Sequence, residues 1–175
     1  MHFTKTLISL MLVGFTATAT AATTDIGELG TFGGPVAING IFGPNAVIND
    51  TYIFDLPFIA SSVVGTAVSL SFDIPNFPGP ELGIQNFTIS LLDSVNTLIA
   101  TDTQSGANDN LVTLTATLHT GFDYQFLVTG TVNGSFGGSY AGLLAAVPIP
   151  EADTYAMMLA GLGLIGFMVS RRRHS

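Results

Sequence analysis

The stretch DYQFLVTGTV (Asp123–Val132) alternates apolar and polar residues in the way that a half-buried β-strand does. Tyr124, Phe126 and Val128 fall on one side of an extended chain, because successive side chains of a strand point to opposite faces. The sequence HTGF leads into this stretch and VNGSFGG follows it, and the Gly and Asn residues in both favour turns. The stretch therefore predicts one strand of a sheet that is buried on its aromatic face.

Similar stretches recur along the chain at spacings of about ten residues, and turn sequences separate them. They are Asn49–Leu56, Gly65–Ile74, Asn86–Asp93, Thr97–Thr103, Asn110–His119, Asp123–Val132 and Gly138–Val147. About seven or eight short strands of this kind predict an all-β fold, an antiparallel β-sandwich that is jelly-roll-like and has no helix before Thr154. Two inner faces would supply the core with Phe54, Leu70, Phe72, Ile89, Leu91, Leu98, Leu114, Leu118, Phe126 and Val128.

The composition excludes several classes of function. Of the 175 residues 47% are hydrophobic and 9% are charged, and the formal net charge is −8. The four Lys and Arg residues are Lys5 and Arg171–Arg173, so the body offers none for binding phosphates and nucleic acid is excluded as its partner. The chain has no Cys, which excludes disulfides, thiol catalysis and cysteine-ligated metal sites.

The N-terminus has the three parts of a secretory signal peptide. Lys5 supplies a positive charge, Leu7–Phe15 is apolar, and Ala19 and Ala21 fit the small-x-small pattern of a cleavage site. We therefore expect a signal peptide at residues 1–21, an exported protein, and a β-sandwich domain at residues 22–148.

The sequence of the C-terminus, residues 149–175, predicts a membrane segment. Its apolar run at 155–170 is close to the lower limit of about 17 residues for crossing a bilayer as a helix. Arg171–Arg173 would stay on the cytoplasmic side by the positive-inside rule. We expect a transmembrane helix at 155–170 that anchors a precursor in the inner membrane, followed by an Arg-rich tail.

The order of features in this tail resembles the PEP-CTERM sorting signal. Pro150 and Glu151 are followed by a short spacer, the aromatic Tyr155, a Gly-rich apolar helix and the cluster of Arg171, Arg172 and Arg173. Ala152 occupies the position at which the motif has its second Pro. The resemblance implies that an exosortase, a membrane processing enzyme of Gram-negative bacteria that make exopolysaccharide, acts on the tail.

The stretch INDTYIFDLP (Ile48–Pro57) resembles the motif of FxDxF-type PEP-CTERM proteins, with Asp50, Tyr52 and Phe54 as its residues here. The strands that follow are similar to that family and, more loosely, to bacterial pre-peptidase C-terminal domains. This resemblance implies an exported β-sandwich with a sorting tail, of a kind to which no enzyme activity is attached.

Residues suited to catalysis or metal binding are few. His119 is the one conventional base of the body, in a predicted turn, and turn capping explains most carboxylates, which are Asp50, Asp55, Asp73, Glu81, Asp93, Asp102, Asp109 and Asp123. No cofactor is predicted. Calcium is the lesser alternative, because its oxygen ligands could come from Asp102, Asn108, Asp109 and Asn110, or from Asn49 and Asp50.

These observations predict a non-enzymatic protein of the envelope or extracellular matrix, sorted by an exosortase and associated with exopolysaccharide at the cell surface. A carbohydrate-binding module is the first alternative. A secreted glycoside hydrolase is the second, and the absence of Trp weighs against it because sugar sites commonly use aromatic platforms.

Overall fold

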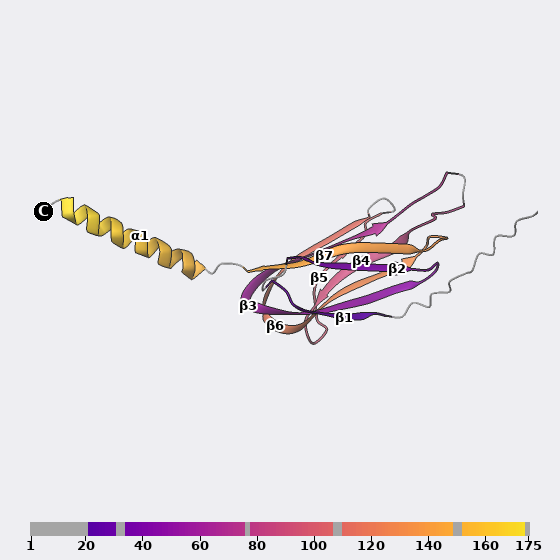
Figure 1. Cartoon of the computed structure of the whole chain (residues 1–175), viewed down its shortest axis with the longest axis horizontal. Helices are drawn as coiled ribbons and strands as arrows, with labels where there is room; N and C mark the ends of the chain where they lie inside the picture. The colour runs from indigo at the N-terminus through magenta and orange to yellow at the C-terminus, as the bar shows by residue number, and fades with distance from the viewer. Residues whose placement is uncertain (1–20, 31–33, 76–77, 107–109, 149–151, 174–175) are drawn as a thin grey trace, which may run out of the picture.

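The protein consists of strands followed by a C-terminal helix (Figure 1). The computed structural model describes residues 21–30, 34–75, 78–106, 110–148 and 152–173. Within them lie seven strands and one helix: β1 (Thr23–Glu28), β2 (Val36–Phe42), β3 (Val47–Leu70), β4 (Ile84–Leu92), β5 (Leu98–Thr103), β6 (Leu111–Val132), β7 (Gly138–Pro148) and α1 (Ala152–Arg173). The all-β prediction is thereby confirmed, while the predicted signal peptide at 1–21 lies almost wholly outside the described residues.

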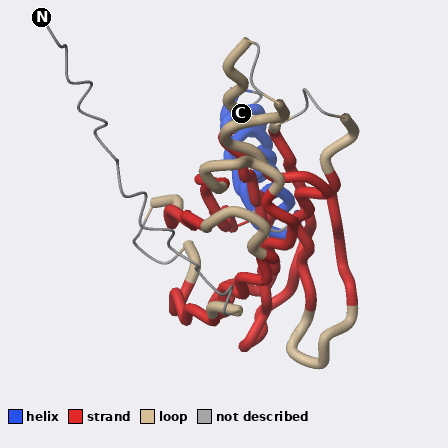
Figure 2. The backbone as a smooth tube through the Cα atoms, turned by 90° about the vertical axis from the view of Figure 1, so that its right-hand side faces the viewer, coloured by secondary structure: helices blue, strands red, loops and turns tan. Residues whose placement is uncertain are grey.

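The strands form one hydrogen-bonded sheet in the order β2-β7-β3-β6-β4-β5, and β1 pairs with β3. The two long strands, β3 and β6, belong to both halves of this sheet. The first part of β3 pairs with the last part of β6, as in Tyr52 opposite Phe126, and the second part of β3 pairs with β7 and with the start of β6. Figure 2 shows that strands (red) make up the body of the protein. The result is a sandwich-like, partly barrel-like fold.

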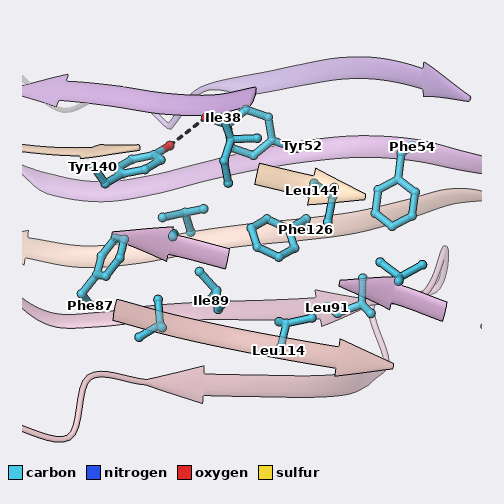
Figure 3. Packing of buried hydrophobic residues seen from close by; sticks show 14 of the residues in the cluster. Ile38, Tyr52, Phe54, Phe87, Ile89, Leu91, Leu114, Phe126, Tyr140 and Leu144 are labelled. Carbon is cyan, nitrogen blue, oxygen red and sulfur yellow. Dashed lines mark hydrogen bonds between the residues drawn. The ribbon is translucent and has the colours of Figure 1, made fainter. Parts of the chain in front are cut away.

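One hydrophobic core lies between the two halves of the sheet (Figure 3). In β6 the alternation that the sequence predicts is observed, and Phe126 and Val128 are fully buried. Phe54 of β3 is also fully buried, so the expected burial of Phe54 and Phe126 is confirmed. A Cβ atom added to Gly65, in the opposite half of the sheet, would lie 2.2 Å from the Phe126 ring. The absence of a side chain at Gly65 is therefore what lets the two layers close over Phe126.

The connectivity differs from the predicted jelly roll of short antiparallel strands. The predicted strands 49–56 and 65–74 belong largely to one strand, β3, and the predicted strands 110–119 and 123–132 belong to β6. The predicted turn at HTGF is a bend within β6, where Gly121 pairs with Leu56 and Asp123 takes a left-handed conformation. In addition β1 runs parallel to β3, because β2 and its connections give the chain the length that a parallel return needs.

Three predicted core residues are wrong: Leu70, Phe72 and Leu98 are each 55% exposed. In the second half of β3 the inward-facing residues are Val63 and several small residues, including Ser61, Gly65 and Ala67. The larger apolar residues Val68 and Leu70 face outward. The large side chains of the facing layer, Phe126 above all, fill the space that these small residues leave. An alternating pattern shows that a strand has two different faces. In this part of β3, however, the face that carries the larger residues is not the buried face.

Candidate functional site

A buried hydrogen-bond network joins the predicted motif residues to a strand at the far end of the sequence. Tyr140 of β7 donates a hydrogen bond to Asp50 Oδ2 at 2.6 Å, and its hydroxyl lies 2.8 Å from that of Tyr52. The Tyr52 hydroxyl also lies 3.2 Å from the carbonyl oxygen of Asn39 in β2. Figure 3 shows the Tyr52–Tyr140 bond within the core. The network therefore ties β2, β3 and β7 together.

Burial changes the chemistry of these hydroxyls. Asp50, Tyr52 and Tyr140 are 6%, 7% and 2% exposed. Burial raises the pKa of Tyr140 far above its usual value, and the hydrogen bond to Asp50 raises it further. Burial also raises the pKa of Tyr52, against the opposing effect of its bond to Tyr140. Both tyrosines stay neutral at physiological pH. Tyr140 donates its hydroxyl hydrogen to the buried Asp50 carboxylate, whereas the hydroxyl of Tyr52 bonds to that of Tyr140 and to the Asn39 carbonyl oxygen.

The third motif residue, Phe54, lies two residues after Tyr52 in β3 and is also buried. Its ring stacks on that of Tyr124 at a centroid distance of 5.7 Å. Asp50, Tyr52 and Phe54 occupy every second position of β3, so their side chains lie on the same face and point inward. The structure brings the predicted motif residues onto one face, where they stabilise the sandwich and contact no solvent-accessible site.

A polar cleft lies at the end of the sandwich where β4 and β7 begin. Its volume is about 580 Å³. We call it the end cleft; its polar side chains are five amides (Gln85, Asn86, Gln104, Asn110 and Asn133), with Ser71, Asp73 and Ser105 beside them. Among the described residues that line it there is no aromatic or basic side chain.

The carboxylates considered for catalysis or metal binding mostly accept hydrogen bonds from backbone amides. Asp93 Oδ1 accepts from Val95 and Thr97, and Asp102 Oδ2 accepts from Thr113 at 2.7 Å. No group of three or more His, Asp or Glu residues in the described ranges could hold a metal ion. Of the other calcium candidates, Asn108 and Asp109 fall in the gap after residue 106. His119 lies exposed within β6 and not in the predicted turn.

The tail begins directly after β7. The helix α1 runs from Ala152 to Arg173 and is longer at both ends than the predicted 155–170. Tyr155 and Arg171 project from it into solvent, whereas Pro150 and Glu151 fall outside the described residues, as do the side chains of Arg172 and Arg173. No helix in the described ranges has the length and apolarity needed to cross a membrane. The transmembrane prediction is thus not confirmed.

The family comparison covers this same segment. Residues 148–173 match the model of the PEP-CTERM protein-sorting motif. The chain carries a PEP-CTERM sorting motif. This confirms the recognition of the tail, while membership of the FxDxF type stays a prediction. The motif indicates a surface protein that is exported as a membrane-anchored precursor and processed by an exosortase, a membrane enzyme.

Comparison of the whole chain adds two similar solved structures. The pre-peptidase C-terminal domain of collagenase from Bacillus anthracis is 14% identical at a TM-score of 0.45, with 74% of this chain and 99% of that chain covered. Aeromonas hydrophila PliG, a periplasmic lysozyme inhibitor of g-type lysozyme, is 9% identical at a TM-score of 0.31, with 71% and 99% covered. No curated protein has a significantly similar sequence.

Two sets of residues escaped the sequence analysis. Tyr140 lies in the predicted strand Gly138–Val147, and nothing in the local sequence connects it to Asp50, 90 residues away. The amides of the end cleft look like ordinary turn residues, and the one local signal is the polar pair Gln85–Asn86 interrupting an apolar strand.

Proposed function

We propose that this chain is an exported, non-enzymatic protein of the cell envelope or extracellular matrix of a Gram-negative bacterium. An exosortase sorts it, and at the surface it associates with exopolysaccharide. The observation that carries the proposal is the sorting motif at residues 148–173, which begins at Pro148, the last residue of the last strand. A folded domain that ends where a sorting motif begins can be released intact.

The tail is suited to being held at a membrane until it is processed. The apolar side chains of α1 are exposed, among them Leu159, Leu164 and Phe167 at 64%, 64% and 66%. A helix that is apolar on all sides is stable when lipid or protein surrounds it, and the described strands do not cover this one. The Arg cluster at the end of this helix would help to hold it at a membrane surface, because Arg is attracted to anionic headgroups.

Two observations support the remaining parts of the proposal. The described carboxylates that could serve a hydrolase are largely engaged as backbone acceptors, which favours a non-enzymatic role. The body carries acidic residues but no Lys or Arg, so it suits a partner that is uncharged. A neutral exopolysaccharide is such a partner.

The test follows an epitope-tagged full-length chain in a host with an exosortase and in the same host lacking it. We expect a shortened product at the surface in the first host and a full-length precursor in the membrane fraction of the second. Replacing Pro150 and Glu151 by Ala should leave the precursor exported and trapped in the membrane. Asp153→Ala, a nearby loss of one acidic residue, is the matched control and should be processed normally. Replacing Arg171–Arg173 by Ser should cause the tail to slip in the membrane or to misinsert.

Equal processing in both hosts would contradict the proposal. Normal release of the variant lacking Pro150 and Glu151 would do the same, because the tail would then be a simple anchor without a recognised motif.

A further inference from the structure

We propose that the end cleft binds a neutral polysaccharide through the hydroxyl groups of its sugar rings. This inference rests on the proposed association with exopolysaccharide and assigns it to a site. The cleft lies where the loops after β3 and β5 meet the start of β4 and the loop after β6. Its volume of about 580 Å³ falls in the range of roughly 300–1,000 Å³ that is usual for small-molecule sites.

A backbone irregularity turns two neighbouring side chains into the cleft. Between Gln85 and Thr88 of β4 the register with β6 shifts, so that one extra residue is accommodated in β4. Asn86 takes the left-handed conformation there, with φ of 54°. In a regular strand Gln85 and Asn86 would point to opposite faces, yet both line the cleft and both are exposed. Bulges of this kind commonly re-aim side chains at functional positions.

The walls of the cleft are held by hydrogen bonds before any ligand arrives. On one side the backbone N–H of Asn133 donates to the carbonyl oxygen of Gly83 at 3.1 Å, and the backbone N–H of Gly83 donates to the carbonyl oxygen of Gly137 at 3.2 Å. On the other side the backbone of Ser69 donates to the carbonyl of Asn110 at 2.8 Å. A cleft fixed in this way loses little conformational entropy when a ligand binds.

The chemistry of the lining selects the class of ligand. Each Asn or Gln amide offers both a donor and an acceptor, which matches sugar hydroxyls because these also donate and accept. Asp73 adds an acceptor, and the described lining has no cation that could pair with a phosphate, sulfate or uronate group. The lining therefore suits a polar ligand without negative charge, and a neutral sugar is such a ligand. Without an aromatic platform the cleft binds a single sugar unit weakly, and a repeating polymer raises the apparent affinity by offering many equivalent positions to the one cleft.

The position of the cleft fits a protein that is first anchored by its tail. Gly138, at the start of β7, lies beside Gly83 of the cleft, and Pro148, at the end of β7, leads to the sorting motif. Ten residue steps of about 3.3 Å separate these ends by about 33 Å. Figure 1 shows α1 beyond the end of β7, so an anchored precursor would present the cleft away from the membrane.

The experiment is calorimetric titration of the full-length chain, kept in mild detergent, with oligosaccharides prepared from dextran, mannan and galactan. Alginate oligosaccharides serve as the anionic comparison. We expect saturable binding of at least one neutral probe and none of alginate. The Gln85→Ala/Asn86→Gly double variant, in which Gly tolerates the left-handed backbone, should bind at least tenfold more weakly, since each lost hydrogen bond contributes about fivefold.

Asn96→Gly is the matched control. Asn96 is an exposed amide with φ of 64° in the turn at the other end of β4, and its replacement should leave binding unchanged. Asn133→Ala provides a second cleft variant, should the double variant fail to fold, and is expected to lose about fivefold. Binding of no neutral probe, preferential binding of alginate, or full binding by the folded cleft variants would overturn the inference. Sorting in the exosortase host is measured separately, so a failure of the cleft would leave the proposed sorting intact.

Discussion

Replacing Tyr140 by Phe removes one hydroxyl and, with it, the donor that the buried Asp50 carboxylate uses at 2.6 Å. A hydrogen bond to a charged group contributes about 1.5–3 kcal/mol to stability, and the neutral bond to Tyr52 about 1 kcal/mol. The carboxylate left behind is 6% exposed, so little water can take over the lost bond. We therefore expect Tyr140→Phe to lower the free energy of unfolding by about 3 kcal/mol.

The assay is urea unfolding of the full-length chain in mild detergent, followed by circular dichroism. A loss of about 3 kcal/mol lowers the urea midpoint by about 1–2 M at a slope of roughly 2 kcal/mol/M. Tyr124→Phe is the matched control: its hydroxyl bonds to the carbonyl of His119 at an exposed position, so it should cost less than about 0.5 kcal/mol.

An Asp50→Asn background isolates the charge. There Tyr140→Phe should cost at least about 1 kcal/mol less, because the unpaired group is then a neutral amide. If Tyr140→Phe destabilises the protein no more than Tyr124→Phe does, the network contributes nothing and the role given to the motif residues is wrong.

Two further predictions concern stability. The raised pKa values of Tyr52 and Tyr140 keep both side chains neutral in the folded state above pH ~10, where tyrosine in the unfolded chain ionises, so the free energy of unfolding should fall as the pH rises through this value. Urea midpoints measured at pH 8, 10 and 11 should therefore fall less steeply for Tyr52→Phe than for the wild type, and equal slopes would contradict this. Gly142→Ala should lower the free energy of unfolding by more than about 2 kcal/mol, because its Cβ would lie 2.1 Å from the Thr66 carbonyl oxygen. Gly34→Ala is the control: its Cβ would meet no atom within 4 Å, so it should leave stability nearly unchanged. Equal melting temperatures for the two variants would refute the close approach of β7 and β3.

The sequence predicted those parts of the fold that a local pattern encodes. In β6 the alternation of Tyr124, Phe126 and Val128 is local, and it correctly indicated a strand and its buried face. The tail was recognised for the same reason, since the sorting motif is a continuous segment. The two N-terminal strands, β1 and β2, were missed because each is short and contains a Gly that weakens its pattern.

The remaining features depend on contacts between distant segments. The inner face of the second half of β3 is set by Phe126 above Gly65, and no pattern within β3 shows this. The partner of Asp50 is Tyr140, which the strand order brings to it from the other end of the domain. The end cleft likewise combines the start of β4 with residues of three connections, each of which has the sequence of an ordinary turn.

The most direct test of the central claim is the intact mass of the protein recovered from the surface of an exosortase-containing host. We predict a chain shortened within or close to residues 148–173, so that the Arg171–Arg173 cluster is absent from the surface form and remains on the precursor. A surface protein whose mass includes Arg171–Arg173 would contradict the account, because the tail would then have been carried outward without processing.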